Sequence, residues 1–484
     1  MNNNNHIFHF HKPTLVIGLG LSGYSCVKFL VNKKCPISVL DTREKPPFID
    51  DLKTNYSDVS FICAEISEQA LTGYEQIIVS PGISPRHPAL IAAQKAEKLI
   101  IGDLNIFIQE TETPVIAVTG SNGKSTVVSL LAHIINHCDK KAIAGGNLGL
   151  PLLDLLQYQV DYYIIELSSF QLETLISTKS NSNIKPFISA SVLNVTEDHM
   201  DRYKDLQDYR ETKQKIYKFA QYQVINQLDS HNTDYKKTET KQAIYFTEQG
   251  PLAGEFGLIC RDKNIDIVSI DKETNKSILW ANSETLKIKG RHNYLNIAST
   301  LALLAPLELD SNKVKQSLTS FEGLDHRCQW VANINNHHFY NDSKGTNVGA
   351  TIAAINSFDD DIVLIAGGIG KDADFSPLAD IIAKKVKGLI LIGHDANLIK
   401  AAVESSITQY KDNQSLTIKL VTNLQKAVTG ALEIASENAI VLFSPACASF
   451  DMFNNYVERG QQFVQEVKQL ASELSVNSKV KETV

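Results

Sequence analysis

The stretch Val115-Ile-Ala-Val-Thr-Gly-Ser-Asn-Gly-Lys-Ser-Thr126 has the pattern of a buried strand, a glycine loop and the start of a helix. Backbone N–H groups of such a loop can wrap a polyphosphate, Lys124 can reach the β- and γ-phosphates, and the Ser125 hydroxyl can ligate Mg²⁺. Val118 stands where the strict Walker pattern has its first glycine, so the loop is a variant of that pattern. The stretch predicts an ATP site; the alternative is a helix start capped by Ser or Thr.

Similar apolar runs recur along the chain and alternate with helical stretches. They are Thr14–Gly18, Ile37–Leu40, Gln76–Val79, Tyr162–Ile165, Ile188–Leu193, Ile362–Ala366, Leu389–Ile392 and Ala439–Phe443. Most are continuously apolar, as expected for parallel strands that helices cover on both faces. The predicted fold class is therefore α/β.

A length of 484 residues suggests about three domains. The sequence GDLNIFIQETETP at 102–114 breaks the first α/β block, and a second break lies at Glu322–Asp325. We therefore predict domains at residues 1–110, 111–323 and 324–484. The polar residues 227–286 are expected to form short strands and loops, and we assign them no chemistry.

Composition excludes several classes of protein. Lys plus Arg total 47 and Asp plus Glu total 54, a net charge of −7 that leaves no basic surplus for nucleic acid. No apolar run reaches the length of a membrane span. The start MNNNNHIFHFHK lacks the layout of a signal peptide and predicts a loose polar tail. The 7 cysteines never form a CxxC pair, which disfavours disulfides or a zinc site and fits a reducing cytosol.

The sequence Gly18-Leu-Gly-Leu-Ser-Gly23 follows the first strand and opens a helix. Glycines at such a turn let the backbone approach a phosphate, and the helix N-terminus attracts it. Asp41 ends the next strand, where a carboxylate could bind ribose or uracil groups. We interpret this region as a nucleotide or nucleotide-sugar site; the alternative is a tight turn. Ser80-Pro-Gly82 follows another strand and could face the same ligand, although alone it is more often just a turn.

Two further groups follow strands of the block that holds the glycine loop. Glu166 comes after DYYII, and Asp198-His-Met-Asp201 comes after SASVLNV. Because ligands bind beyond the carboxyl ends of parallel strands, these side chains should converge on the loop. A carboxylate and an imidazole beside a triphosphate suit divalent metals held partly by substrate oxygens. The alternatives are that Glu166 caps the next helix and that His199 is a surface turn residue.

The last block offers cations and hydroxyls after its strands. They lie in His326-Arg327, in NDSKGTN at 341–347, in GGIGK at 367–371 and in SPACAS at 444–449. We expect one cleft there for an anionic second substrate and a transferring phosphate. Cys447 could be a nucleophile, but a small buried cysteine is the stronger interpretation.

Taken in order, these motifs resemble the Mur ligases over all three blocks. The matching motifs are GLGLSG, DTR, SPG, TGSNGKST, GNLGLP, ELSSFQLE, LNVTEDHMDRY, GRHNYLN, HRCQW, NDSKGTN, GGIGKDADF and SPACASFDMFNNYVERG. TGSNGKST and HN would also fit the related folylpolyglutamate synthetases. ELSSFQLE, DHMDRY and SPACASFDMF resemble the members that add D-glutamate.

The resemblance implies an N-terminal Rossmann-like domain for a UDP-sugar, a central P-loop ATPase-like parallel sheet and a C-terminal Rossmann-like domain for the amino acid. It implies ATP-dependent addition of D-glutamate to UDP-N-acetylmuramoyl-L-alanine, through an acyl phosphate and a tetrahedral intermediate, in cytoplasmic peptidoglycan precursor synthesis. We expect a monomer with no nucleic-acid partner and no membrane insertion. The alternatives are a Mur-type ligase for another amino acid and a catalytically silent UDP-sugar-binding homologue.

The resemblance also carries roles onto individual positions. The UDP-sugar would be held by Leu21, Ser22, Asp41, Thr42, Arg43, Gly82 and Asn147. ATP would be held by Gly120, Ser121, Asn122, Gly123, Lys124, Ser125, Thr126, Asn293, Arg327 and Asp342. Two Mg²⁺ ions would be bound by Ser125, Glu166, His199 and Lys213. D-glutamate would be bound by Thr346, Lys371, Ser449 and Tyr456. The catalytic set would be Lys124, Glu166, His199 and Lys213.

Lys213 corresponds to the family's lysine that CO₂ carbamylates, although from sequence alone it is an ordinary surface lysine. The chain departs from the family pattern in three places. The stretch before Leu206 is one residue shorter, so choosing Lys213 over Lys215 is a judgement of register. Tyr456 replaces a common Phe and adds a hydroxyl, and Ile369 replaces an expected acidic residue.

Overall fold

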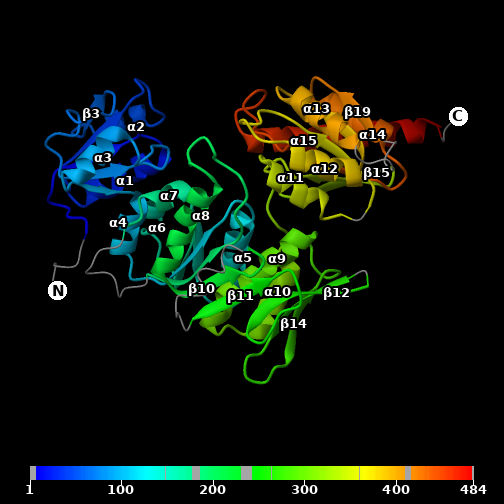
Figure 1. Ribbon diagram of the computed structural model, residues 1–484, viewed down its shortest axis with the longest axis horizontal. Helices are drawn as coiled ribbons and strands as arrows, with labels where there is room; N and C mark the ends of the chain where they lie inside the picture. The colour runs from blue at the N-terminus through cyan, green and yellow to red at the C-terminus, as the bar shows by residue number, and fades with distance from the viewer. Residues whose placement is uncertain are drawn as a thin grey trace. The chain divides into compact units, whose positions relative to one another are not determined.

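The structure is a computed structural model in which three mostly parallel sheets follow one another along the chain (Figure 1). It describes residues 7–147, 149–176, 186–229, 242–262, 264–358, 360–408 and 416–481. Each apolar run predicted to be a strand is one, which confirms the α/β class.

The first sheet is wholly parallel, in the order β3-β2-β1-β4-β5. Its strands are β1 (Thr14–Ile17), β2 (Ile37–Asp41), β3 (Ser60–Cys63), β4 (Gln76–Val79) and β5 (Leu99–Ile101). The helices of this part are α1 (Leu21–Asn32), α2 (Ile49–Asn55), α3 (Pro88–Lys95) and α4 (Asp103–Glu110). The order reverses between β1 and β4, and such a switch point is where parallel sheets bind ligands.

The second sheet has nine strands in the order β14-β13-β12-β11-β10-β9-β6-β8-β7. They are β6 (Val115–Thr119), β7 (Ala142–Gly146), β8 (Tyr162–Glu166), β9 (Phe187–Val192), β10 (Ala220–Asn226), β11 (Ala243–Thr247), β12 (Glu255–Arg261), β13 (Asn264–Ile270) and β14 (Ser277–Asn282). The helices of this part of the chain are α5 (Lys124–His137), α6 (Leu152–Leu155), α7 (Ser169–Glu173), α8 (Leu206–Gln214), α9 (Arg291–Leu304) and α10 (Ser311–Ser320). Strand β6 lies between β8 and β9, so the glycine loop after it is flanked by the ends of both.

The third sheet has the order β15-β16-β20-β17-β18-β19, with only the β15–β16 pair antiparallel. Its strands are β15 (Gln329–Ile334), β16 (His337–Asn341), β17 (Ile362–Ala366), β18 (Val386–Leu391), β19 (Thr417–Leu420) and β20 (Ile440–Phe443). The helices are α11 (Val348–Ile355), α12 (Ser376–Lys385), α13 (Ala396–Ile407), α14 (Leu424–Ile434) and α15 (Tyr456–Lys481).

The chain forms two compact units. One comprises Met1–Asn282 with Leu295–Thr319, and the other comprises Ser283–Tyr294 with Ser320–Val484. Within the first unit, a single hydrophobic core joins both sheets, since Val16 and Val39 of the first cluster with Val115 and Phe187 of the second. The domain bounds 1–110, 111–323 and 324–484 stay predictions.

One expectation about local structure needs correction. The segment MNNNNHIFHFHK is not wholly a loose tail, because Phe8 lies in the core and its backbone N–H donates to Gln109 Oε1 at 3.0 Å. Residues 1–6 lie outside the described part of the chain. The expectation of short strands and loops at residues 227–286 is confirmed in their described part, where β11 to β14 extend the second sheet and β12 and β13 pair antiparallel.

Two predicted absences can be compared with the described residues. All seven cysteines lie in that part of the chain, and all are free thiols. No helix in the described ranges is both long enough and apolar enough to cross a bilayer.

Candidate active site

The glycine loop between β6 and α5 adopts a backbone that glycine permits. Gly120 has φ +152° and Gly123 has φ +83°. A Cβ on Gly123 would lie 2.5 Å from Asn296 Oδ1. The end of β9 holds the loop in shape, because Ser121 N donates to Asn194 O at 2.9 Å. The loop is therefore formed in advance, with the N-terminus of α5 behind it as an anion site.

Lys124 lies across this loop. Its ammonium donates to Gly120 O at 2.7 Å and to Ser121 O at 2.8 Å. A cation is thus held at the glycine loop, and its contact with the phosphates of a nucleotide stays a prediction.

Glu166 joins two other predicted residues, the buried Ser125 and the exposed Asn147, in one hydrogen-bonded group. It is the last residue of β8, and Ser125 Oγ donates to its Oε2 at 2.6 Å. Asn147 Nδ2 donates to its Oε1 at 2.8 Å. Glu166 does not cap the next helix, because Ser168 does so by accepting from Gln171 N. The alternative interpretation of Glu166 as a helix cap is therefore wrong.

His199 lies on the turn after β9 in the left-handed region, at φ +58°. Its ring centroid is 4.8 Å from that of Phe170, and its Nε2 is 3.7 Å from Asp198 Oδ2. The imidazole is partly exposed, so it can still meet a ligand.

Lys213 is 1% exposed, so the interpretation as an ordinary surface lysine is wrong. Its Nζ donates to Gly120 O at 3.0 Å, beneath the glycine loop. Burial, and then the Lys124 ammonium, hold the pKa of the Lys213 amine well below its usual range. The carboxylates of Asp198 and Glu166 act in the opposite direction. A lowered pKa favours the neutral amine over the ammonium, and a neutral amine is a nucleophile.

The structure also distinguishes Lys213 from the alternative in the other register. Lys215 Nζ donates to Glu173 O at 3.2 Å, so its contact is with α7 and not with the glycine loop. The geometry therefore favours Lys213 as the lysine of the family pattern.

The protein alone offers a sparse set of metal ligands here. In the described ranges, no three His, Cys, Asp or Glu side chains gather closely enough to hold a metal ion. The hydroxyl of Ser125, the carboxylate of Glu166 and the imidazole of His199 fit Mg²⁺ only if substrate oxygens complete its shell. That donor set suits a metal that arrives with a nucleotide.

The predicted UDP-sugar residues other than Asn147 lie at or after the ends of strands β1, β2 and β4 of the first sheet, and Asn147 follows β7 of the second. Leu19 N donates to Asp41 Oδ2 at 2.7 Å, and the Arg43 guanidinium donates to both Asp41 oxygens at 2.9 and 2.7 Å. Burial would raise the pKa of Asp41, but these bonds lower it to about 2. Asp41 therefore fixes the first glycine turn as an anion.

The remaining predicted residues of this part of the site present open positions. Leu21 is exposed and Ser22 is half-buried at the start of α1. Thr42 is exposed, and a Cβ on Gly82 would have no neighbour within 4 Å. A cavity of about 710 Å³ lined by Lys33, among others, includes none of the predicted site residues.

The second unit gathers its predicted residues at the carboxyl ends of β16, β17 and β20. Asp342 Oδ2 accepts from Ser444 Oγ at 2.7 Å, and Gly367 N donates to Pro445 O at 2.8 Å. Burial raises the pKa of Asp342 to about 7, although Ser444 and the half-buried Arg327 oppose the shift. The expected convergence of these loops is confirmed within this unit.

The predicted D-glutamate residues lie around the same edge. Thr346 is half-buried, Lys371 is exposed at φ +54°, and Ser449 is buried with its carbonyl accepting from the N–H groups of the following turn. Tyr456 begins α15 with its ring centroid 3.9 Å from Lys344 Nζ.

Three other positions of this unit can be placed. Asn293, from the predicted ATP set, is buried and donates to Lys289 O at 2.8 Å. Ile369 exchanges backbone hydrogen bonds with Ala448, so the departure from an acidic residue does not disturb this pairing. Cys447 is fully buried, and burial raises its thiol pKa to about 12, which agrees with a packing role.

One buried residue of this site was missed from the sequence. Arg459 donates to Cys447 O at 3.0 Å and to Ser343 O at 2.8 Å, so it ties the loops after β16 and β20 together. The sequence indicates a role for Arg459 only through its place in the motif YVERG. A single arginine in a helix is otherwise typical of an exposed position.

A parallel sheet whose glycine loop carries Lys124, with Ser125 and Glu166 beside it, defines a P-loop-type nucleotide-binding protein. Comparison with protein families narrows this class. The chain matches the "Mur ligase MurD-like, N-terminal domain" at residues 12–102, the "Mur ligase middle domain" at 118–304 and the "Mur ligase, glutamate ligase domain" at 326–447. The chain belongs to the Mur ligase family, and three domains in this order are its architecture.

Curated relatives match nearly the whole chain. A Pseudomonas aeruginosa protein named UDP-N-acetylmuramoylalanine–D-glutamate ligase is 40% identical over 94% of this chain and 98% of its own. A Marinobacter nauticus protein of the same name is 38% identical over 93% and 97%.

Solved structures agree at the level of the fold. The UDP-N-acetylmuramate-alanine ligase of Thermotoga maritima aligns with a TM-score of 0.56 at 17% identity, over 95% of this chain and 100% of its own. A second ligase of that organism, solved with ADP, gives 0.56 at 13% identity, over 96% of each chain.

Proposed function

We propose that this protein is an ATP-dependent ligase that joins D-glutamate to UDP-N-acetylmuramoyl-L-alanine in peptidoglycan precursor synthesis. The observation that carries the proposal is the 40% identity, over 94% of the chain, to a relative named for that reaction. The location in the cytoplasm and the monomeric state are parts of the same proposal.

The proposed reaction has two steps. The terminal carboxylate of the substrate attacks the γ-phosphorus of ATP, which gives an acyl phosphate and ADP. The amine of D-glutamate then attacks the acyl carbon, the tetrahedral intermediate expels phosphate, and the amine proton is lost to leave an amide. Both reactants of the first step are anions, so the site must neutralise their charge.

The residues of the first unit supply that neutralisation. The Lys124 ammonium and the loop N–H groups would hold the transferring phosphate. Mg²⁺, when bound, draws charge away from the phosphoryl group. Ser125, Glu166 and His199 would hold it together with substrate oxygens.

We further propose that Lys213 carries a carbamate in the working enzyme. Its neutral amine nitrogen would form a bond to the carbon of CO₂ and release one proton, and the product is an anion beneath the glycine loop. The burial of Lys213 and its lowered pKa support this assignment. Carbon NMR with labelled CO₂ tests it: a carbamate signal in the wild type that is absent from Lys213→Met is expected, and no signal in active enzyme would contradict it.

In the second unit, Thr346, Lys371, Ser449 and Tyr456 would bind D-glutamate, while Asn293, Arg327 and Asp342 would complete the ATP site. A substrate panel tests the whole proposal. ATP-dependent phosphate release from UDP-N-acetylmuramoyl-L-alanine is expected with D-glutamate and not with L-glutamate, L-alanine or diamino acids. Release with another amino acid only, or no release at all, would reject the function and favour one of the two alternatives.

A further inference from the structure

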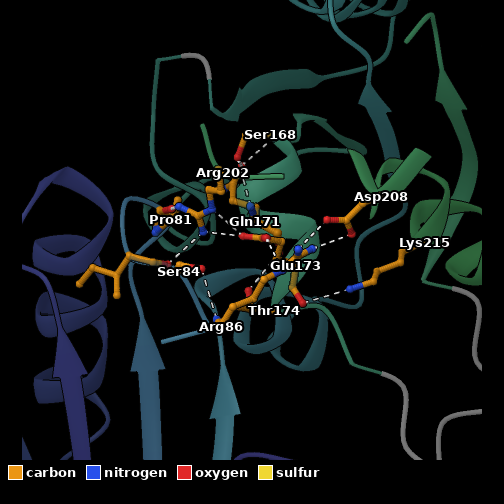
Figure 2. Close-up of polar contacts among 11 residues, drawn as sticks. Pro81, Ser84, Arg86, Ser168, Gln171, Glu173, Thr174, Arg202, Asp208 and Lys215 are labelled. Atoms are coloured by element: carbon orange, nitrogen blue, oxygen red, sulfur yellow. Dashed lines mark hydrogen bonds and ion pairs between the residues drawn. The ribbon is translucent and has the colours of Figure 1, made fainter. Parts of the chain in front are cut away.

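Arg202 follows His199 by three residues and has no role among the predicted site residues. Its side chain is 10% exposed. Nη1 donates to Pro81 O at 3.0 Å and Nη2 to Ile83 O at 3.0 Å, while Nε donates to Glu173 Oε2 at 2.9 Å (Figure 2). The guanidinium of Arg202, which follows a strand of the second sheet, thus holds two backbone carbonyls that follow a strand of the first sheet.

The two carbonyls flank Gly82, a predicted contact of the UDP-sugar. A Cβ on Gly82 would meet nothing within 4 Å, so the outer side of this turn is open. On its inner side, Ser80 Oγ donates to Gly18 O at 2.9 Å. A Cβ on Gly18 would lie only 3.0 Å from Ser80 Cβ, so the turn packs directly on the first glycine turn. Arg202 therefore binds the backbone carbonyls of the turn that would contact the UDP-sugar.

The other contacts of Arg202 lead to the predicted metal residues. Its guanidinium carbon lies 3.9 Å from the ring centroid of Phe170, and that ring contacts the His199 imidazole. Phe170 and Glu173 belong to α7, the short helix that follows Glu166 closely in sequence. Arg202 also donates its backbone N–H to His199 O at 2.9 Å. A single side chain therefore connects the turn of Gly82 with α7 and His199.

A second arginine nearby, Arg86, does not take the role of Arg202. Arg86 donates to Asp208 at 2.5 and 2.8 Å and its Nε lies 3.5 Å from Glu173 Oε1, but its side chain is 44% exposed and it holds neither carbonyl of the Gly82 turn. Exposed ion pairs contribute little, whereas the bonds of Arg202 are shielded from water. The planar guanidinium carries its donors on three separate nitrogens, so Nε reaches the carboxylate while each Nη reaches one carbonyl, whereas the three donors of a lysine share one nitrogen.

We propose that Arg202 is a positioning residue for the UDP-sugar, which fastens the turn carrying Gly82 to α7 and so sets where the nucleotide lies relative to the glycine loop. The inference rests on the proposed function for the identity of the ligand. Without Arg202, the turn would become ordered only when the ligand binds, and the entropic cost of that ordering would weaken the binding of UDP.

Binding of UDP and of ADP to the full-length protein, measured by calorimetry without Mg²⁺, tests the proposal. We expect Arg202→Ala to raise the Kd for UDP about tenfold, which corresponds to about 1.4 kcal/mol. The Kd for UDP of Arg202→Lys should lie between those of Arg202→Ala and the wild type. The Kd for ADP should change less than about twofold in each variant, since other residues shape the glycine loop. Arg210→Lys is the matched control, because Arg210 is buried too but contacts Gln207 and Asp229.

Two results would overturn the proposal. One is an unchanged Kd for UDP in folded Arg202→Ala; the other is a parallel weakening of UDP and ADP, which a general loss of structure would cause. If Arg202→Ala does not fold, the variants Arg202→Lys and Glu173→Gln replace it in the test. Each should weaken the binding of UDP more than that of ADP. An unchanged Kd for UDP in both variants would refute the role of Arg202. UDP binding needs no amino acid, so a wild type that binds UDP without using D-glutamate would contradict the proposed function alone.

Discussion

Replacement of Lys213 by Met should separate activity from stability. The Lys213 amine makes one hydrogen bond, to Gly120 O at 3.0 Å, and a net hydrogen bond contributes about 1 kcal/mol to folding. Met keeps most of the apolar stem and removes an amine whose burial is unfavourable when charged. The free energy of unfolding should therefore change by no more than about 1 kcal/mol.

Activity should respond very differently. If the anion on Lys213 supports the second metal, kcat should fall about 100-fold or more, the usual effect of losing one preorganised charge. The assay is phosphate release with both substrates and ATP, beside denaturant unfolding of the same samples.

Lys215→Met is the matched control, because Lys215 lies two residues further on and bonds to the carbonyl of Glu173. It should retain kcat within about threefold. Turnover of Lys213→Met at the wild-type rate, or the large loss appearing in Lys215→Met instead, would refute the reasoning.

Four further predictions concern the loops of both units. Lys124→Ala should abolish ATP turnover and leave the Kd for UDP within about twofold, as judged by calorimetry. Gly123→Ala should weaken ADP binding and lower the melting temperature, because alanine is strained at φ +83° and its Cβ would lie 2.5 Å from Asn296 Oδ1. Lys371→Ala should raise the KM for D-glutamate about tenfold or more with little change for ATP; an unchanged KM would remove it from the site. The pKa of Asp342, raised to about 7, means that the folded state holds a proton there which the unfolded state releases near pH 4. Its contribution to stability is therefore lost as pH rises from about 4 to about 7, and Asp342→Asn should flatten that slope in unfolding curves.

Much of the fold was readable from apolar runs, because parallel strands buried on both faces leave a strong local pattern. Glycines after those strands were equally readable, and Gly123 does adopt a positive φ. Residues whose burial is set by distant parts of the chain were not. Helix α8 reads LQDYRETKQ, a polar sequence, yet Lys213 is buried because the helix packs under the glycine loop. The sequence likewise predicts a tail around Phe8, because the partner of its backbone N–H, Gln109, lies far along the chain.

The arginines illustrate the same limit. Arg202 and Arg459 each hold two backbone carbonyls of distant loops, and a backbone carbonyl leaves no trace in the identity of its residue. Only the assembled chain shows what these side chains hold together.

The common interior of the first two sheets limits how this protein can change its preference for a nucleotide sugar. Val16 and Phe187 belong to one hydrophobic cluster, so replacing the first sheet by another domain would expose apolar side chains of the second sheet to water. New preferences must instead arise on the rim, at short turns such as those of Gly82 and Thr42, where a replaced side chain disturbs nothing beneath it.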